Sequence, residues 1–273
     1  MKTRTQLVAG ILAPLLVVAA EQTALSSWSD SEKERFLQTA KVVKTKDLSI
    51  GVTGTQRLTL SDGVSTHDAH FQNIDVSQMK FESPRGSEMN FRDSYKYNIA
   101  GYRLDRMLDL RMAPVSVERK IGGRTGAMTW WVDDVQMMES ERLKKKIKAP
   151  DLDKWNDQMH QVNLFTELIY NTDQNMTNLL ITNDWTLWMI DFSRAFRRYT
   201  TLRDAKRLGR VDRRVWLKLT SLSKEKLTDG TKPFLIGPEI DGVLARRDRI
   251  VEFFQKELAR KGEAAVICGL PGH

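Results

Sequence analysis

The chain has 273 residues, of which 41% are hydrophobic and 29% are charged, so it has enough apolar side chains to fill a core. Its ordinary glycine and proline content and its mixed periodicity exclude collagen-like, coiled-coil and disordered classes. The formal charge of +8 favours an anionic partner. The basic residues are spread along the chain, so the charge alone does not choose between nucleotide, phospholipid and nucleic acid.

The first twenty residues have the organisation of a secretory signal peptide. Lys2 and Arg4 precede an uncharged, largely apolar run over 7–20, and Val18-x-Ala20 is typical of a cleavage site. A membrane helix needs about 20 apolar residues, which is longer than this run. We therefore expect export to the periplasm or the exterior and no further transmembrane span. A buried helix or a misassigned start codon is the alternative.

The pattern after this leader changes from strand-like to helix-like along the chain. A single helix is expected in the region 21–44, and a β-rich lobe with one main helix over 45–134. A mostly helical lobe follows over 135–265, with a short tail over 266–273. Together these regions predict an α+β protein with two unlike lobes.

The elements of the first lobe follow from capping residues, alternation and turns. A helix over 27–43 begins near Ser29 or Asp30 and carries acidic residues in its first turn. Asp93 is expected to cap a second helix over 94–110. The predicted strands cover 48–53, 57–60, 69–74, 115–119 and 127–132, with turns at Asp62-Gly63 and Gly122-Gly123. From Asp133 onward we expect helices, interrupted by one short hairpin around 179–191.

Three polar residues around that hairpin carry the chemistry. Asp173 and Asn178 follow an amphipathic helix over 155–170, and Asp191 follows the second strand of the hairpin. Phosphoryl transfer to a hydroxyl needs an acceptor for the hydroxyl proton and oxygen ligands for Mg²⁺. Asp173 supplies such an acceptor, and Asn178 and Asp191 supply the hard oxygen ligands that Mg²⁺ prefers.

These residues resemble the motifs of the protein-kinase-like superfamily. Asp173-x4-Asn178 matches the spacing of the kinase catalytic loop, and Asp191-Phe-Ser matches the Asp-Phe-Gly position with Ser193 in place of glycine. The sequence around Asp173, Asn178 and Asp191 is most similar to the atypical branch of this superfamily. That branch includes phosphoinositide-kinase-like, HipA-like and secretory-pathway kinases and an exported bacterial group. The resemblance covers about 45–260. It implies a two-lobed kinase-like fold, ATP and Mg²⁺ or Mn²⁺ as cofactors, and a protein, lipid or small-molecule acceptor.

The resemblance also reveals two departures in the first lobe. Gln72 stands where the family has a strand lysine that holds the nucleotide phosphates, and Asn98 stands where it has the partner glutamate on the next helix. An amide pair can keep the hydrogen bond between strand and helix, but it presents no cation. The turn Gly51-Val-Thr-Gly54 matches the loop that covers phosphates with backbone N–H groups, although an ordinary strand turn explains it too.

Three interpretations of the missing lysine stay open. Another cation substitutes, with Arg57, Lys80 and Arg92 the nearest in sequence. Alternatively, the protein is a pseudokinase that binds a nucleotide or a partner without turnover. The third interpretation is an error in the assigned strand register. The sequence thus predicts an exported kinase-like phosphotransferase or, as its alternative, a catalytically impaired scaffold, and it carries no nucleic-acid-binding signature.

Overall fold

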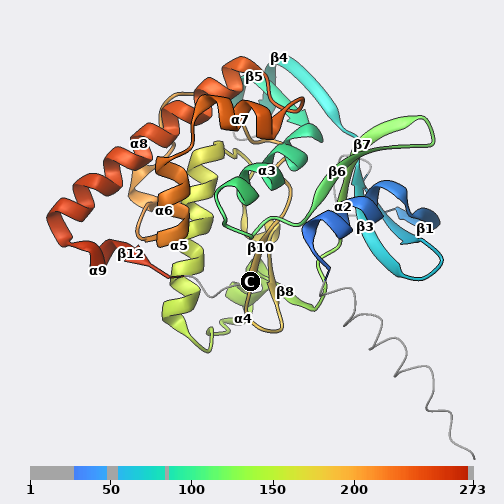
Figure 1. Cartoon of the computed structure of the whole chain (residues 1–273), viewed down its shortest axis with the longest axis horizontal. Helices are drawn as coiled ribbons and strands as arrows, with labels where there is room; N and C mark the ends of the chain where they lie inside the picture. Colours follow the sequence, from blue (N-terminus) through green and yellow to red (C-terminus); the bar gives the residue numbers. More distant parts are fainter. Residues whose placement is uncertain (1–27, 48–54, 84–85, 270–273) are drawn as a thin grey trace, which may run out of the picture.

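The computed structural model describes residues 28–47, 55–83 and 86–269, and it divides into a β-rich part and a helical part (Figure 1). The predicted α+β architecture is confirmed by this division. The predicted signal peptide and the turn with Gly51 and Gly54 lie outside the described residues.

The β-rich part is built on an antiparallel five-stranded sheet with one helix against it. The strands are β1 (Lys41–Asp47), β2 (Gln56–Ser61), β3 (Thr66–Gln72), β6 (Ser116–Ile121) and β7 (Arg124–Trp130), in the order β1-β2-β3-β7-β6. The helix α2 (Asp30–Thr39) begins at Ser29, whose hydroxyl and backbone exchange hydrogen bonds with Glu32 in a capping box. It ends earlier than the predicted 43, because the β-branched Val42 and its neighbours pair with β2 instead.

A hairpin that the sequence pattern did not predict lies between β3 and the second helix. It consists of β4 (Asp75–Ser83) and β5 (Gly86–Ser94), which form a separate two-stranded sheet. The end of β5 packs on the segment after Asp191, since the Ser94 N–H donates to the Ser193 carbonyl at 2.8 Å and Arg197 Nη1 donates to the Arg92 carbonyl at 2.6 Å. The hairpin therefore covers the chain that leaves the predicted metal ligand.

The main helix of this part, α3 (Lys96–Met107), is shorter than the predicted 94–110. Its cap position is Tyr95, which makes no side-chain capping bond. The expectation that Asp93 caps the helix is wrong, because Asp93 is the penultimate residue of β5 and its carboxylate accepts from Arg194.

The second part is mainly helical and carries short strands. Its helices are α4 (Glu139–Lys145), α5 (Leu152–Ile169), α6 (Arg213–Thr220), α7 (Lys224–Thr231), α8 (Gly237–Lys261) and α9 (Glu263–Val266). Its strands are β8 (Val135–Met138), β9 (Leu179–Thr182), β10 (Leu187–Met189), β11 (Val211–Asp212) and β12 (Ile267–Cys268). The predicted hairpin is β9–β10. Residues 135–138 are a strand and not the expected helix, because they pair with β9 at its other edge.

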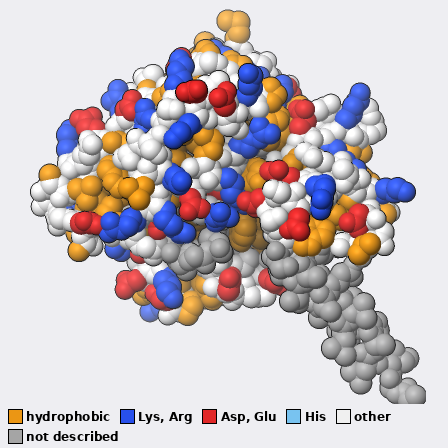
Figure 2. Space-filling model, viewed as in Figure 1, with side chains coloured by type: hydrophobic (Ala, Val, Ile, Leu, Met, Phe, Trp, Pro, Cys, Tyr) orange, Lys and Arg blue, Asp and Glu red, His pale blue; other side chains and the backbone are white. Residues whose placement is uncertain are grey.

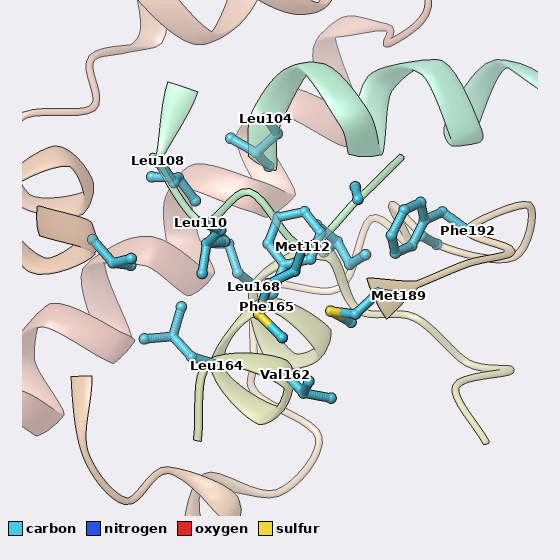
Figure 3. Close-up of a cluster of buried hydrophobic side chains, with 14 of the residues drawn as sticks. Leu104, Leu108, Leu110, Met112, Val162, Leu164, Phe165, Leu168, Met189 and Phe192 are labelled. Atoms are coloured by element: carbon cyan, nitrogen blue, oxygen red, sulfur yellow. The ribbon is translucent and has the colours of Figure 1, made fainter. Parts of the chain in front are cut away.

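The main core joins α3 to α5 through the residue that follows Asp191. Leu104 of α3, Phe165 of α5 and Phe192 belong to one buried cluster (Figure 3), and the rings of Phe165 and Phe192 meet edge to face at 5.8 Å. Gly101 allows α3 to lie against Phe192, since a Cβ at this position would come within 2.6 Å of the ring. The chain after Asp191 is therefore anchored in the core and not left in a loose loop.

The surface shows basic and acidic side chains interleaved on the face seen in Figure 2. Within the part of the chain that the structure describes, no helix is long and apolar enough to cross a membrane.

Candidate functional site

The loop that holds Asp173 is organised by its own side chains. α5 ends at Ile169, and Tyr170 follows in the left-handed conformation with φ 48°. The Asn171 side-chain oxygen then accepts from the Asp173 N–H at 3.1 Å, and Asn178 Nδ2 donates to the Asp173 carbonyl at 3.2 Å. These bonds fix the backbone on both sides of Asp173 and leave its carboxylate about one third exposed.

The β9–β10 hairpin brings Asn178 beside the segment that carries Asp191. Asn178 immediately precedes β9, and the Ile190 N–H after β10 donates to the Asn178 carbonyl at 3.0 Å. On the other side, Asn171 Nδ2 reaches the Asp191 carbonyl at 3.5 Å. The structure therefore gathers the loop of Asp173, Asn178 and Asp191 in one place, as the spacing of the sequence motif predicts.

Asp191 occupies a constrained position. Its φ of 59° is in the left-handed region, which is unfavourable for a residue with a side chain and is typical of functional sites. Its Oδ1 accepts from the Ser193 N–H at 3.3 Å. Part of its surface is open to solvent, but protein atoms crowd the carboxylate, and this desolvation raises the pKa of Asp191 above its ordinary value.

The donor set at this point suits a divalent cation that shares its ligands with phosphates. Asn178 uses its nitrogen for the Asp173 carbonyl, which leaves its side-chain oxygen without a hydrogen bond among the described residues. The described residues contain no cluster of three or more His, Cys, Asp or Glu able to hold a metal by themselves. Mg²⁺ is commonly held by one or two carboxylates together with substrate phosphates, and Asp191 with Asn178 fits that pattern.

The predicted amide pair is present between strand and helix. Asn98 Nδ2 donates to Gln72 Oε1 at 2.5 Å, and both side chains are buried. Asn98 Oδ1 in turn accepts from the Phe192 N–H at 2.7 Å. This contact supports the assigned strand register and shows that Asn98 ties β3, α3 and the Asp191-Phe192 segment together. A role of the pair in binding nucleotide stays a prediction.

None of the three cations suggested by the sequence stands free at this site. Arg57, which lies opposite His70 in the β2–β3 pair, forms an ion pair with Asp68 at 2.5 Å and stacks on Trp131 at 4.1 Å. Lys80 is paired with Glu82 at 2.5 Å on the exposed hairpin. Arg92 lies 3.7 Å from the buried Glu239. The expectation that one of them replaces the lysine is therefore not supported by their positions.

Arg194 is the basic residue that sequence reasoning missed. Its Nε lies 3.0 Å from Asp93 Oδ2 and its Nη1 lies 3.8 Å from Asp173 Oδ2. Burial works against its charge, but the hydrogen bond and ion pair with Asp93, helped by Asp173 and Asp191, raise the pKa of Arg194. Its place three residues after Asp191 was the available signal in the sequence. Asp93, its partner, is far away along the chain.

A separate cavity of about 130 Å³ lies between the β4–β5 hairpin and residues 196–199. It is lined by Arg92, Arg197 and Glu239 among others, and none of its lining residues is Asp173, Asn178 or Asp191. Glu239 also accepts from the Tyr97 hydroxyl at 2.5 Å and from the Ile236 N–H at 2.9 Å. The second contact caps α8, which has Pro238 in its first turn. The cavity is therefore separate from the place where the Asp173 loop, Asn178 and Asp191 converge.

Solved structures of kinases share this fold. The structure of hydra Fam20 with sugar matches with a TM-score of 0.64 and 16% identity, covering 86% of this chain and 91% of that chain. The Golgi casein kinase matches with a TM-score of 0.60 and 15% identity over 89% of this chain and 80% of that chain. The structure of the Golgi casein kinase with Mn/ADP bound matches with a TM-score of 0.61 and 14% identity, covering 87% of this chain and 78% of that chain.

The chain therefore has a kinase-like fold of the atypical type that the Asp173-x4-Asn178 and Asp191-Phe-Ser motifs indicated. No protein-family model matches the sequence. No curated protein matches it either.

Proposed function

We propose that this protein is an exported kinase-like phosphotransferase that moves the γ-phosphoryl group of ATP to a hydroxyl acceptor. The observation that carries the proposal is the convergence of the Asp173 loop, Asn178 and Asp191 at the ends of β9 and β10. The kinase-like fold supports it, because that fold offers a nucleotide cleft between its two lobes.

Each residue has a defined role in the proposed reaction. The acceptor oxygen bonds to the γ-phosphorus while the bond between that phosphorus and the β,γ-bridging oxygen breaks, and ADP leaves. The Asp173 carboxylate takes the proton of the acceptor hydroxyl. Asn178 and Asp191 hold Mg²⁺ or Mn²⁺, which when bound neutralises charge on the nucleotide phosphates. The structural neighbour with Mn/ADP bound supports this choice of cofactors.

Export is proposed on the basis of the leader sequence alone. Lys2, Arg4 and the apolar run over 7–20 form the pattern of a signal peptide. The acceptor is then a protein, lipid or small molecule reached outside the cytoplasm.

The second candidate function is a pseudokinase scaffold, which the Gln72–Asn98 pair favours. Both side chains are neutral, so this part of the cleft offers no cation to the nucleotide phosphates. Such a protein would bind a nucleotide or a partner in the same cleft without turnover.

A single pair of assays separates the two candidates. Binding of ADP and ATP to the full chain is measured by calorimetry with Mg²⁺ or Mn²⁺, and transfer from γ-labelled ATP is measured on casein and on small hydroxyl acceptors. Metal-dependent binding together with labelled product supports the transferase. The scaffold is supported if wild-type protein binds nucleotide but forms no more labelled product than Asp173→Asn does.

A further inference from the structure

Arg194 places a guanidinium group directly beside the proposed base. Its Nη1 lies 3.8 Å from Asp173 Oδ2, the carboxylate that is expected to face the acceptor hydroxyl. About 31% of the Arg194 side chain is exposed, so the group is reachable from solvent. Whatever phosphoryl group is transferred to a hydroxyl at Asp173 must pass next to this cation.

The position of Arg194 is fixed on several sides. Asp93, only 4% exposed, accepts from Arg194 Nε at 3.0 Å. The Arg194 carbonyl accepts from both the N–H and the hydroxyl of Thr172, each at 3.2 Å. The stacked rings of Phe81 and Phe91 lie 5.9 and 5.2 Å from the guanidinium carbon. The β4–β5 hairpin therefore contributes an acid and two aromatic rings that hold this arginine.

The outer nitrogens of the guanidinium group make no hydrogen bond in the described part of the chain, although Nη1 forms the 3.8 Å ion pair with Asp173. The hydrogen bond to Asp93 uses Nε, and within the described residues neither Nη1 nor Nη2 has a hydrogen bond. An arginine fork matches two phosphate oxygens well, because its parallel N–H groups can bind them in a bidentate manner. A buried acid holds Nε, Nη1 has only the 3.8 Å ion pair with Asp173, and Nη2 has no hydrogen bond among the described residues, which is an arrangement expected of a phosphate-binding arginine.

We propose that Arg194 binds the γ-phosphoryl group of the nucleotide and that Asp93 is the residue that positions it. This inference rests on the proposed function and adds the phosphate subsite that the Gln72–Asn98 pair cannot provide. Because Arg194 lies beside Asp173, it serves the transferred phosphoryl group and not the α- and β-phosphates.

The position of this subsite predicts a difference between two nucleotides. ADP lacks the γ-phosphoryl group, so its affinity should not depend on Arg194, whereas the affinity for a non-hydrolysable ATP analogue should. Charge-assisted hydrogen bonds to a phosphate support an expected loss of about tenfold to a hundredfold for the analogue. Asp93→Asn keeps an acceptor for Nε but removes its charge, so a smaller loss in the same direction is expected.

The test is calorimetric titration of the full chain with Mn²⁺ plus ADP and Mn²⁺ plus the analogue. It compares wild type, Arg194→Gln, Arg194→Lys and the matched control Arg198→Gln, which changes an exposed arginine four residues later on the same segment. The proposal predicts that the affinity of Arg194→Gln for ADP stays within about twofold of wild type, whereas its affinity for the analogue falls by the expected tenfold to hundredfold. Arg194→Lys should lose less, and Arg198→Gln should behave as wild type.

Two results would overturn the inference while leaving the proposed function intact. The first is a ratio of analogue affinity to ADP affinity that is the same in both Arg194 variants as in wild type. The second is an equal loss of affinity for the analogue and for ADP in Arg194→Lys while its melting temperature is unchanged. If wild type binds neither nucleotide, the proposed function fails and the inference fails with it.

Discussion

The side chains of Asn98 and Gln72 share a buried hydrogen bond of 2.5 Å between β3 and α3. The same Asn98 amide accepts from the Phe192 backbone at 2.7 Å, so one uncharged side chain links the strand, the helix and the segment of the proposed metal ligand. Since both residues are buried and neutral, a charge placed on either side chain alone would have no partner of opposite charge in this pair.

Introducing one charge at either position should therefore destabilise the fold, whereas introducing opposite charges at both positions should destabilise it much less. Gln72→Lys or Asn98→Glu alone buries an unpaired charge, with an expected cost of about 3–5 kcal/mol in the free energy of unfolding. The double variant regains a pair, so its cost should be well below the sum of the two. Chemical denaturation of the four proteins measures this coupling. Additive costs would contradict a direct interaction between the two side chains.

Gly101 should resist the usual gain from alanine in a helix. An alanine normally stabilises a helix interior by about 1 kcal/mol relative to glycine. Here the added Cβ would lie 2.6 Å from the Phe192 ring, so we expect a net loss of about 1–3 kcal/mol for Gly101→Ala. Thermal melts compare it with Gly237→Ala, where a Cβ meets nothing within 4 Å. Equal melting temperatures for the two variants would show that Phe192 does not pack as described.

His70 should make the fold sensitive to acid. Burial lowers the pKa of His70 to about 4, compared with 6.5 for an unperturbed histidine. Because the folded value is the lower one, the unfolded chain binds the proton more readily, and stability is lost as the pH falls from about 6.5 towards 4. Denaturation midpoints at pH 7.5, 6 and 5 should therefore decline less steeply in His70→Gln than in wild type. Parallel curves would assign the acid sensitivity to other groups.

Asp173→Asn should separate binding from transfer. The amide keeps the size of the side chain but cannot take up the proton of the acceptor, so transfer should fall by about 10²–10⁴-fold. Nucleotide affinity should stay near the wild-type value, because Asp173 is not among the proposed metal ligands. Transfer from labelled ATP and calorimetry with ADP measure the two effects. Full transfer activity in Asp173→Asn would remove this residue from the mechanism.

The parts of the site that are close in sequence were predictable. Asp173, Asn178 and Asp191 lie on one helix–loop–hairpin unit, where short-range spacing determines which side chains meet. The Gln72–Asn98 contact was predictable from the resemblance to kinases, in which the residues at these two positions form a pair between strand and helix.

The β4–β5 hairpin and its contact with Arg194 could not be predicted in the same way. β4 is largely exposed, and its alternation of apolar and polar residues is confined to Met79-Lys80-Phe81-Glu82, which is a weak strand signal. Asp93 and Arg194 are 101 residues apart, and nothing local to either residue indicates the other. An Asp just before a helix favours a capping role, but Asp93 instead pairs with Arg194 across the fold.

The central claim is that Asp191 completes a metal-dependent nucleotide site, and a thermal melt of the full chain tests it most directly. Wild type and Asp191→Ala are melted with and without ADP and Mn²⁺, each component also being added alone. A ligand at 100 times its Kd adds about 2.7 kcal/mol, so we predict a rise of roughly 5–10 °C for wild type that needs both components and is absent in Asp191→Ala. A cooperative melt of wild type that does not move with nucleotide and metal together, or an equal rise in Asp191→Ala, would contradict the account.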